Sequence, residues 1–117
     1  MPDISQAQAI AAEEHAIHSE QQGKLTKQCG QVVEGMGGQQ RQHGKLIQEY
    51  GQATQKHAQA SQRHAQAAQK SDANSKSEYM KAKKETGLEI EQHSKAIKEY
   101  GRVVQQRLNS SRQVLNN

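Results

Sequence analysis

Six histidines and one cysteine are the side chains of this 117-residue chain that point most directly to chemistry. His15 and His18 stand three residues apart, so a helix would place them on one face beside Glu14, as in some metal sites. A metal ion needs a complete set of ligands, and neither a Glu-x-x-His pair nor a Cys-x-x-Cys motif accompanies them. The sequence therefore predicts no metal site and no cofactor.

Cys29 stands alone, so it has no partner for a disulfide within the chain. A catalytic thiolate also needs an activating base and a pocket that excludes water, which an elongated helical chain does not offer. The glycines recur every seven residues and do not match a phosphate-binding loop. We therefore expect no enzymatic activity.

Most of the histidines share one position of a seven-residue repeat. Polar residues at such a position fix the register of packed helices, as Asn does in leucine zippers. Protonation would place like charges in each layer, so the sequence predicts an assembly that loosens below about pH 6. When residues 8–70 are divided into heptads, the histidines at position a are His15, His43, His57 and His64, and His93 lies on the matching track further along.

The remaining positions of these heptads form a stripe without charge. Position b is always Gly or Ala, and every charged residue of the window falls at c, f or g. Such a stripe is typical of a helix that packs on one face, and a seven-residue period kept this long indicates a supercoil with partner helices. The predicted packing residues are Gly23, Gly30, Gly37, Gly44, Gly51, Ala58, Ala65, Leu25, Val32, Leu46, Ile47 and Tyr50.

An internal repeat extends the pattern to the second half of the chain. The segment 42–56, QHGKLIQEYGQATQK, returns at 92–106 as QHSKAIKEYGRVVQQ, and a fainter copy occupies 21–35. The repeat adds Ile90, Ile97, Tyr100, Gly101 and Val104 to the predicted helix-packing interface.

The composition excludes an ordinary globular core. The chain has no Phe and no Trp, and its 5 Leu, 6 Ile and 5 Val make up about 14% of the residues, below the roughly 20% expected of a folded domain. The 20 Gln and 14 Ala nevertheless favour helix. The scarcity of large side chains predicts a core that depends on partner helices.

We therefore predict an all-α fold, an elongated coiled-coil helical hairpin that forms oligomers. A single unit over 1–117 would contain a long heptad helix over 5–70, a turn or skip at 71–77 and a second helix over 78–115. One long helix and a three-helix spectrin-like bundle, broken at the glycines of 34–38, are the alternatives. The heptad phase is the same on both sides of 34–38, which favours a continuous helix.

A helix of this length cannot be covered by a shorter second one, so the sequence predicts self-assembly. Residues 1–38, 39–77 and 78–117 carry net charges of −3, +4 and +3, which could pair between neighbouring chains. The predicted function is a structural subunit of a homo-oligomeric bundle, tube or filament. The alternatives are a helical interaction or secreted adaptor protein, or an amphipathic helix that binds nucleic acid through Lys76, Lys81, Lys83 and Lys84, or a lipid surface.

No targeting signal is recognisable in the sequence. Its first residues lack the charged and apolar regions of a signal peptide, and no apolar run approaches the ~20 residues of a membrane span. The expectation is a protein that stays in the cytoplasm or leaves by a route without a signal peptide.

Overall fold

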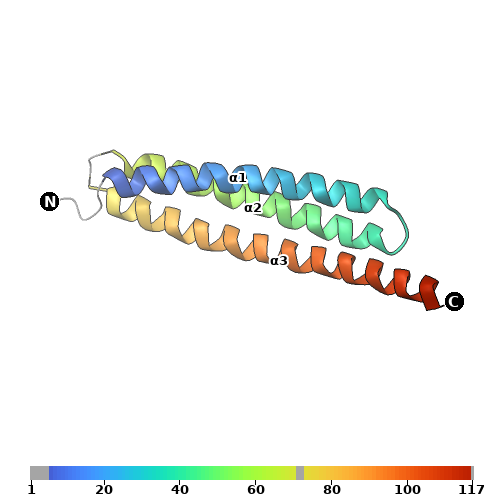
Figure 1. Cartoon of the computed structure of the whole chain (residues 1–117). Helices are drawn as coiled ribbons and strands as arrows, with labels where there is room; N and C mark the ends of the chain where they lie inside the picture. Colours follow the sequence, from blue (N-terminus) through green and yellow to red (C-terminus); the bar gives the residue numbers. More distant parts are fainter. Residues whose placement is uncertain (1–5, 71–72, 117) are drawn as a thin grey trace.

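The computed structural model describes residues 6–70 and 73–116, which form three α-helices and no strand. Helix α1 spans Gln6–Gly35, α2 spans Gln40–Ala68 and α3 spans Ser75–Asn116. They run up, down and up in an elongated bundle whose longest dimension is 71 Å (Figure 1). The all-α prediction is confirmed. Residue 5 of the predicted first helix and residues 71 and 72 of the predicted turn lie outside the described residues.

The predicted continuous helix over 5–70 is wrong, because the chain reverses after Gly35. Gly37 and Gly38 have φ angles of +71° and +56°, in the left-handed region that glycine enters without a steric cost. The first turn of α2 forms directly on them, with the Gln40 amide donating to the Gly37 carbonyl at 3.2 Å. The break lies where the three-helix alternative placed it, so neither the two-helix hairpin nor the single long helix describes the chain.

Helices α1 and α2 approach each other backbone to backbone. A Cβ added to Gly23 would lie 2.9 Å from the Gly51 carbonyl oxygen, and one added to Gly51 would lie 2.9 Å from the Gly23 oxygen. Gly30 and Gly44 are related in the same reciprocal way, at 2.8 and 2.7 Å. This seam explains the small residues at position b, because a larger side chain would force the helices apart. It continues through alanines without exposed surface, namely Ala9, Ala16, Ala58 and Ala65.

The large apolar side chains of the core are few. Val33 of α1, Ile47 of α2 and Val103 of α3 form one buried cluster, with Cys29 packed against it. The rest of the interior is small or polar, including Thr54 and Ser61. The fold therefore depends on close helix approach over a long distance, as the composition predicts, and less on burying large side chains.

Helix α3 packs on α2 through a ladder of histidine–glutamate pairs. The ring nitrogens Nδ1 of His43, His57 and His64 lie 2.5, 2.7 and 2.6 Å from carboxylate oxygens of Glu99, Glu85 and Glu78, respectively. The residue numbers of all three pairs have the same sum, which means that one antiparallel register holds along the interface. In this register α3 buries every seventh residue, namely Ser75, Ala82, Glu89, Ala96 and Val103.

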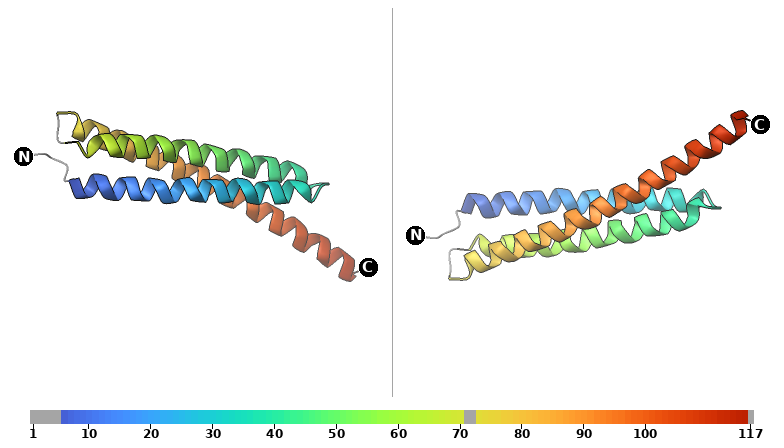
Figure 2. Two further views of the ribbon diagram at one scale, coloured as in Figure 1. Left: turned by 90° about the horizontal axis from the view of Figure 1, so that it is seen from above. Right: turned by 90° about the horizontal axis from the view of Figure 1, so that it is seen from below.

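Helix α3 diverges from α1 and continues past the turn between α1 and α2 (Figure 2). Its 42 residues correspond to roughly 63 Å, against roughly 44 Å for the 29 residues of α2. Val103 is the last buried residue of α3, so the described residues leave the final turns of the helix largely uncovered, apart from a contact of Arg107 with the Met36 sulfur at 3.3 Å. This leaves one side and one end of the bundle open.

Candidate functional site

The open side of the bundle is a groove between α1 and α3, with α2 as its floor. Helices α1 and α3 touch each other far less than either touches α2. Hollows follow one another along this groove, and their volumes are about 290, 110 and 200 Å³ from the N-terminal end of α1 onward. Each is lined by residues of both α1 and α3.

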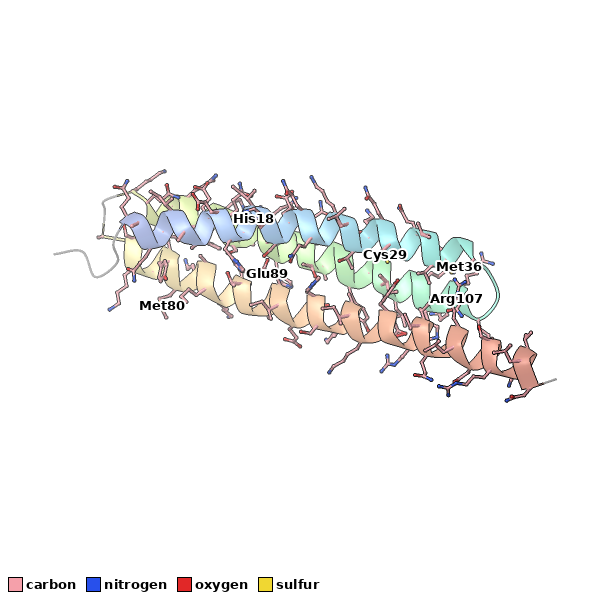
Figure 3. The ribbon with its side chains drawn as sticks, viewed as in Figure 1. His18, Cys29, Met36, Met80, Glu89 and Arg107 are labelled. Atoms are coloured by element: carbon pink, nitrogen blue, oxygen red, sulfur yellow. The ribbon has the colours of Figure 1, made fainter. Side chains whose placement is uncertain are left out.

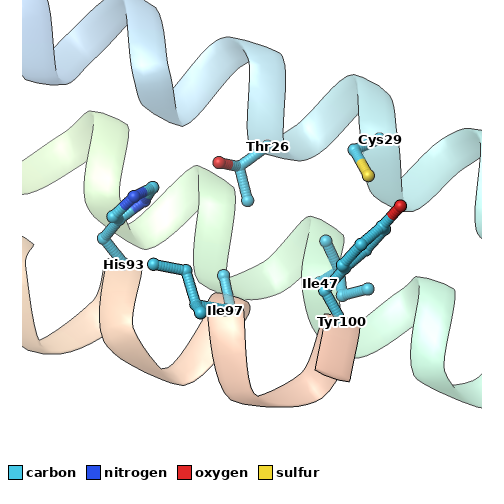
Figure 4. A pocket seen from close by; sticks show the side chains of 7 residues that line it. Thr26, Cys29, Ile47, His93, Ile97 and Tyr100 are labelled. Atoms are coloured by element: carbon cyan, nitrogen blue, oxygen red, sulfur yellow. The ribbon is translucent and has the colours of Figure 1, made fainter. Parts of the chain in front are cut away.

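The last of these hollows is almost wholly apolar (Figure 4). Thr26 and Cys29 of α1 line one wall, Ile97 and Tyr100 of α3 line the other, and Ile47 of α2 forms the floor. Ile97 and Tyr100 remain 59% and 47% exposed, because no residue of the described chain covers the mouth of the hollow. An exposed apolar surface beside a long helix is typical of a site for another helix.

Glu89 is a buried carboxylate at the centre of the groove. Figure 3 shows it on the side of α3 that faces α1, whereas Met80 points away from the other helices. Glu89 is 2% exposed, and its Oε1 lies 3.2 Å from Nε2 of His15. Burial raises the pKa of Glu89 above its ordinary value, against the opposing effects of a hydrogen bond from Ser19 and the nearby His15 and His93. Its Oε2 has no hydrogen-bond partner among the described residues.

Two glutamates of the ladder show the opposite pKa shift. A hydrogen bond from His64 lowers the pKa of Glu78, and the cation of Lys81 adds to the effect. Burial alone would raise the pKa of Glu99, but hydrogen bonds from His43 and Arg102 more than offset it, so this pKa is lowered. These hydrogen bonds therefore favour the charged state of Glu78 and Glu99.

Within the described chain the histidines do not form the predicted layers, and layers between chains stay a prediction. His43, His57 and His64 face glutamates, so protonating them would add attraction instead of repulsion between α2 and α3. His15 and His93 likewise lie beside Glu89. Repulsion between facing histidines, the predicted cause of a looser assembly below pH 6, therefore does not arise within a single bundle.

The structure separates the predicted packing residues into a buried set and an exposed set. The α1–α2 seam buries Gly23, Gly30, Gly44, Gly51, Ala58, Ala65 and Ile47, with Leu46 and Tyr50 half-buried and Gly37 in the turn. Exposed to a large extent are Leu25, Val32, Ile90, Ile97, Tyr100, Gly101 and Val104.

The predicted packing residues of α3 are exposed in the single chain, so any packing role they have lies between chains and stays a prediction. By the internal repeat, Ile97 and Gly101 match Ile47 and Gly51, yet the first pair is exposed and the second is buried. The reason is that α2 has already used this face to meet α1. Helix α3 packs on the remaining face of α2 through a different set of heptad positions. The α3 residues that match the seam residues of α2, such as Ile97 and Gly101, therefore face outward.

The glutamates of the ladder are residues that the sequence analysis did not identify. Their signal is present in the sequence, because Glu78, Glu85 and Glu99 keep the same seven-residue spacing as the histidines of α2. Gln92 and Tyr50 stand at the level where a further pair would fall. Charge at a heptad position looks like an intrusion into the stripe until its partner is known.

Other candidate chemistry finds little support in the geometry. Among residues 6–70 and 73–116, no group of three or more His, Cys, Asp or Glu side chains is arranged to hold a metal ion. His18, the predicted neighbour of His15, is exposed. No helix in the described part of the chain is long and apolar enough to cross a membrane. Comparison with family models, curated proteins and solved structures gave no significant match.

Proposed function

We propose that this chain is a structural subunit that assembles with copies of itself through α3 and the open side of the bundle. The observation that carries the proposal is a row of apolar side chains on α3 that nothing in the described chain covers. Ile90, Ile97 and Val104 are 54%, 59% and 42% exposed, and Leu108 continues the row at 49%. Soluble monomers rarely leave such a continuous apolar surface on one helix.

The free end of α3 supports the same proposal. Beyond Arg107, whose guanidinium still donates to the Met36 sulfur at 3.3 Å, the helix leaves the bundle. Its last side chains include Val114 and Leu115, which are 76% and 85% exposed. An isolated helical end of this kind is only marginally stable in water, so a partner that covers it gains from its order. A second copy that binds both the row and the overhang would extend the structure along its long axis.

The expected strength of this association is modest. Burying a half-exposed apolar side chain contributes roughly 1 kcal/mol, so the four side chains of the row on each of two copies contribute roughly 8 kcal/mol. Association costs about 4–15 kcal/mol in lost freedom of motion. A single such contact therefore gives a weak dimer, and stable assembly needs contacts repeated along many copies.

Sedimentation equilibrium from about 1 μM to about 1 mM tests the proposal, because a weak dimer dissociates within this range. The mean mass should rise with concentration for the parent and should stay at 13.0 kDa for Ile97→Lys. Gln52→Lys adds the same charge at an exposed position of α2, outside both the apolar row and the free end of α3, so it should behave as the parent. A parent that is monomeric throughout the range would refute self-assembly.

A helical adaptor that binds a different protein is the second candidate. The apolar groove between α1 and α3 is suited to another helix whatever its source. A parent chain that is monomeric at every concentration would favour this function. The nucleic-acid alternative is weaker, because Lys81 pairs with Glu78 at 3.5 Å and Lys83 lies over the ring of Tyr79 at 5.7 Å.

A further inference from the structure

The contact between α1 and α2 is a template for helix pairing in this chain. Position b of one helix meets position b of the other, as Gly23 meets Gly51 and Gly30 meets Gly44. At position f, four residues beyond Gly44 and Gly30 in their own helices, the Gln48 amide donates a 2.7 Å hydrogen bond to Oε1 of Glu34. Positions b and f therefore define the antiparallel register in which α1 and α2 pair.

Helix α3 carries the same set of positions on its exposed face. Gly87, Ser94 and Gly101 occupy the b positions, and each is exposed. A Cβ added to either glycine would meet no atom within 4 Å, in contrast to the glycines of the α1–α2 seam. Ile90, Ile97 and Val104 occupy the e positions, where Val33 and Ile47 stand in the seam.

We infer that α3 pairs antiparallel with α3 of a second copy, in the register of the α1–α2 seam and about a two-fold axis beside Ser94. This inference rests on the proposed function and names its surface. The pattern of small residues reads the same in both directions, so Gly87 falls opposite Gly101 of the second copy and Ser94 falls opposite its own equivalent. A symmetric dimer needs a self-complementary surface of this kind.

The apolar positions fit the same axis. Ile97 lies near its own equivalent and Ile90 lies near Val104 of the second copy, with the offset that separates Val33 and Ile47 from the glycine pairs of the seam. The axis brings two Ser94 side chains together. A serine is nearly as small as an alanine, and the α1–α2 seam already accommodates an alanine pair, Ala16 and Ala58. The interface thus repeats within a dimer the packing that the hairpin shows within one chain.

The flanking charges predict how salt affects this dimer. Position f brings Glu91 within side-chain reach of Gln105 of the second copy, which repeats the Glu34–Gln48 arrangement. It also brings Lys98 near its own equivalent, and these like charges repel. Salt screens such repulsion, so the dimer should become tighter as ionic strength rises, and Lys98→Gln should strengthen it at low salt.

Cysteine cross-linking tests the axis. In a Cys29→Ser background, Ser94→Cys should form a disulfide-linked dimer under mild oxidation, because the two thiols meet at the axis. Ser110→Cys is the matched control, since the register separates its two copies by about 48 Å along the helix. Equal cross-linking of both variants, or cross-linking of the control alone, would overturn the register.

A second variant pair keeps the test independent of thiol chemistry. Gly101→Leu fills the seam and should raise the dissociation constant at least tenfold, while Ser110→Leu on another face should leave it unchanged. Circular dichroism is expected to show both variants helical, because leucine favours helix over glycine. If the parent associates and Gly101→Leu associates equally well, this surface is wrong but self-assembly stands. If the parent never associates, both proposals fall.

Discussion

The glycines of this chain predict two opposite responses to the same substitution. Gly44 lies in the α1–α2 seam, where an added Cβ would be 2.3 Å from the Glu34 backbone nitrogen and 2.6 Å from its Cα. Gly87 lies on the exposed face of α3, where an added Cβ meets nothing within 4 Å. Changing each to alanine adds one methyl group to a helix in both cases, so the difference reports the closeness of the seam.

The magnitudes follow from two competing effects. Alanine is better than glycine in a helix by about 0.8–1.0 kcal/mol, and Gly87→Ala should gain this amount. Gly44→Ala gains the same but must also push two backbones apart, and overpacking costs roughly 1–3 kcal/mol. Its cost should lie at the upper end because the obstacles are backbone atoms, which leaves a net loss of about 1–2 kcal/mol.

Urea unfolding, monitored by far-UV circular dichroism, measures the change in the free energy of unfolding for both variants, and thermal unfolding monitored in the same way gives their Tm. Both measurements use a concentration low enough to keep the chain monomeric. For a domain of this size 1 kcal/mol corresponds to about 4 °C in Tm, so Gly44→Ala should melt about 4–8 °C lower and Gly87→Ala about 4 °C higher. The reasoning would be refuted if Gly44→Ala proved as stable as Gly87→Ala. That result would mean that the helices are further apart than the seam requires.

Two further predictions concern pH. The pKa values of Glu78 and Glu99 are lowered in the folded chain, so the stability that these groups contribute is complete above the ordinary glutamate pKa of 4.5 and is lost as pH falls below it. Thermal melts between pH 7 and 3 should show this loss of stability. The Glu99→Gln variant should lose less stability over the same range. The pKa of Glu89 is raised, which has the opposite effect, so the parent should gain stability from this group as pH falls from neutral towards 4.5. The Glu89→Gln variant should be more stable than the parent at pH 7 and should lack this gain at lower pH. A variant that is less stable than the parent at pH 7 would show that the charged carboxylate stabilises the fold.

Much of the fold can be predicted from periodicity. Gly and Ala at position b specify a close seam, and the structure has one, because a stripe of small residues has no other way to exclude water. The orientation of α3 could not be predicted from the same rule. Its b and e positions match those of α2, but a helix has only one such face, and α2 uses it on α1.

The pairing of charges explains why the candidate site was harder to predict than the fold. His43, His57 and His64 are recognisable as a periodic set, and their spacing matches that of Glu78, Glu85 and Glu99. Whether histidines face each other or face glutamates depends on which helices are neighbours, and this follows only from the position of the turn. Once the chain reverses between Ala68 and Ser75, the glutamates of α3 lie within reach of the histidines of α2, and the sign of the expected pH response changes.

The unbroken heptad phase across residues 34–38 is consistent with a turn for a geometric reason. Gly37 itself occupies position b, and the seam pairs residues that lie equally far before and after it, as Gly30 pairs with Gly44 and Gly23 with Gly51. A hairpin folded at a b position brings b onto b only if the phase is the same on both sides. The constancy that suggested one continuous helix is therefore also the condition for a symmetric antiparallel pair. The same condition holds about Ser94 on α3, where Gly87 and Gly101 lie equally far on either side, but there the chain does not turn and a second copy must supply the other helix.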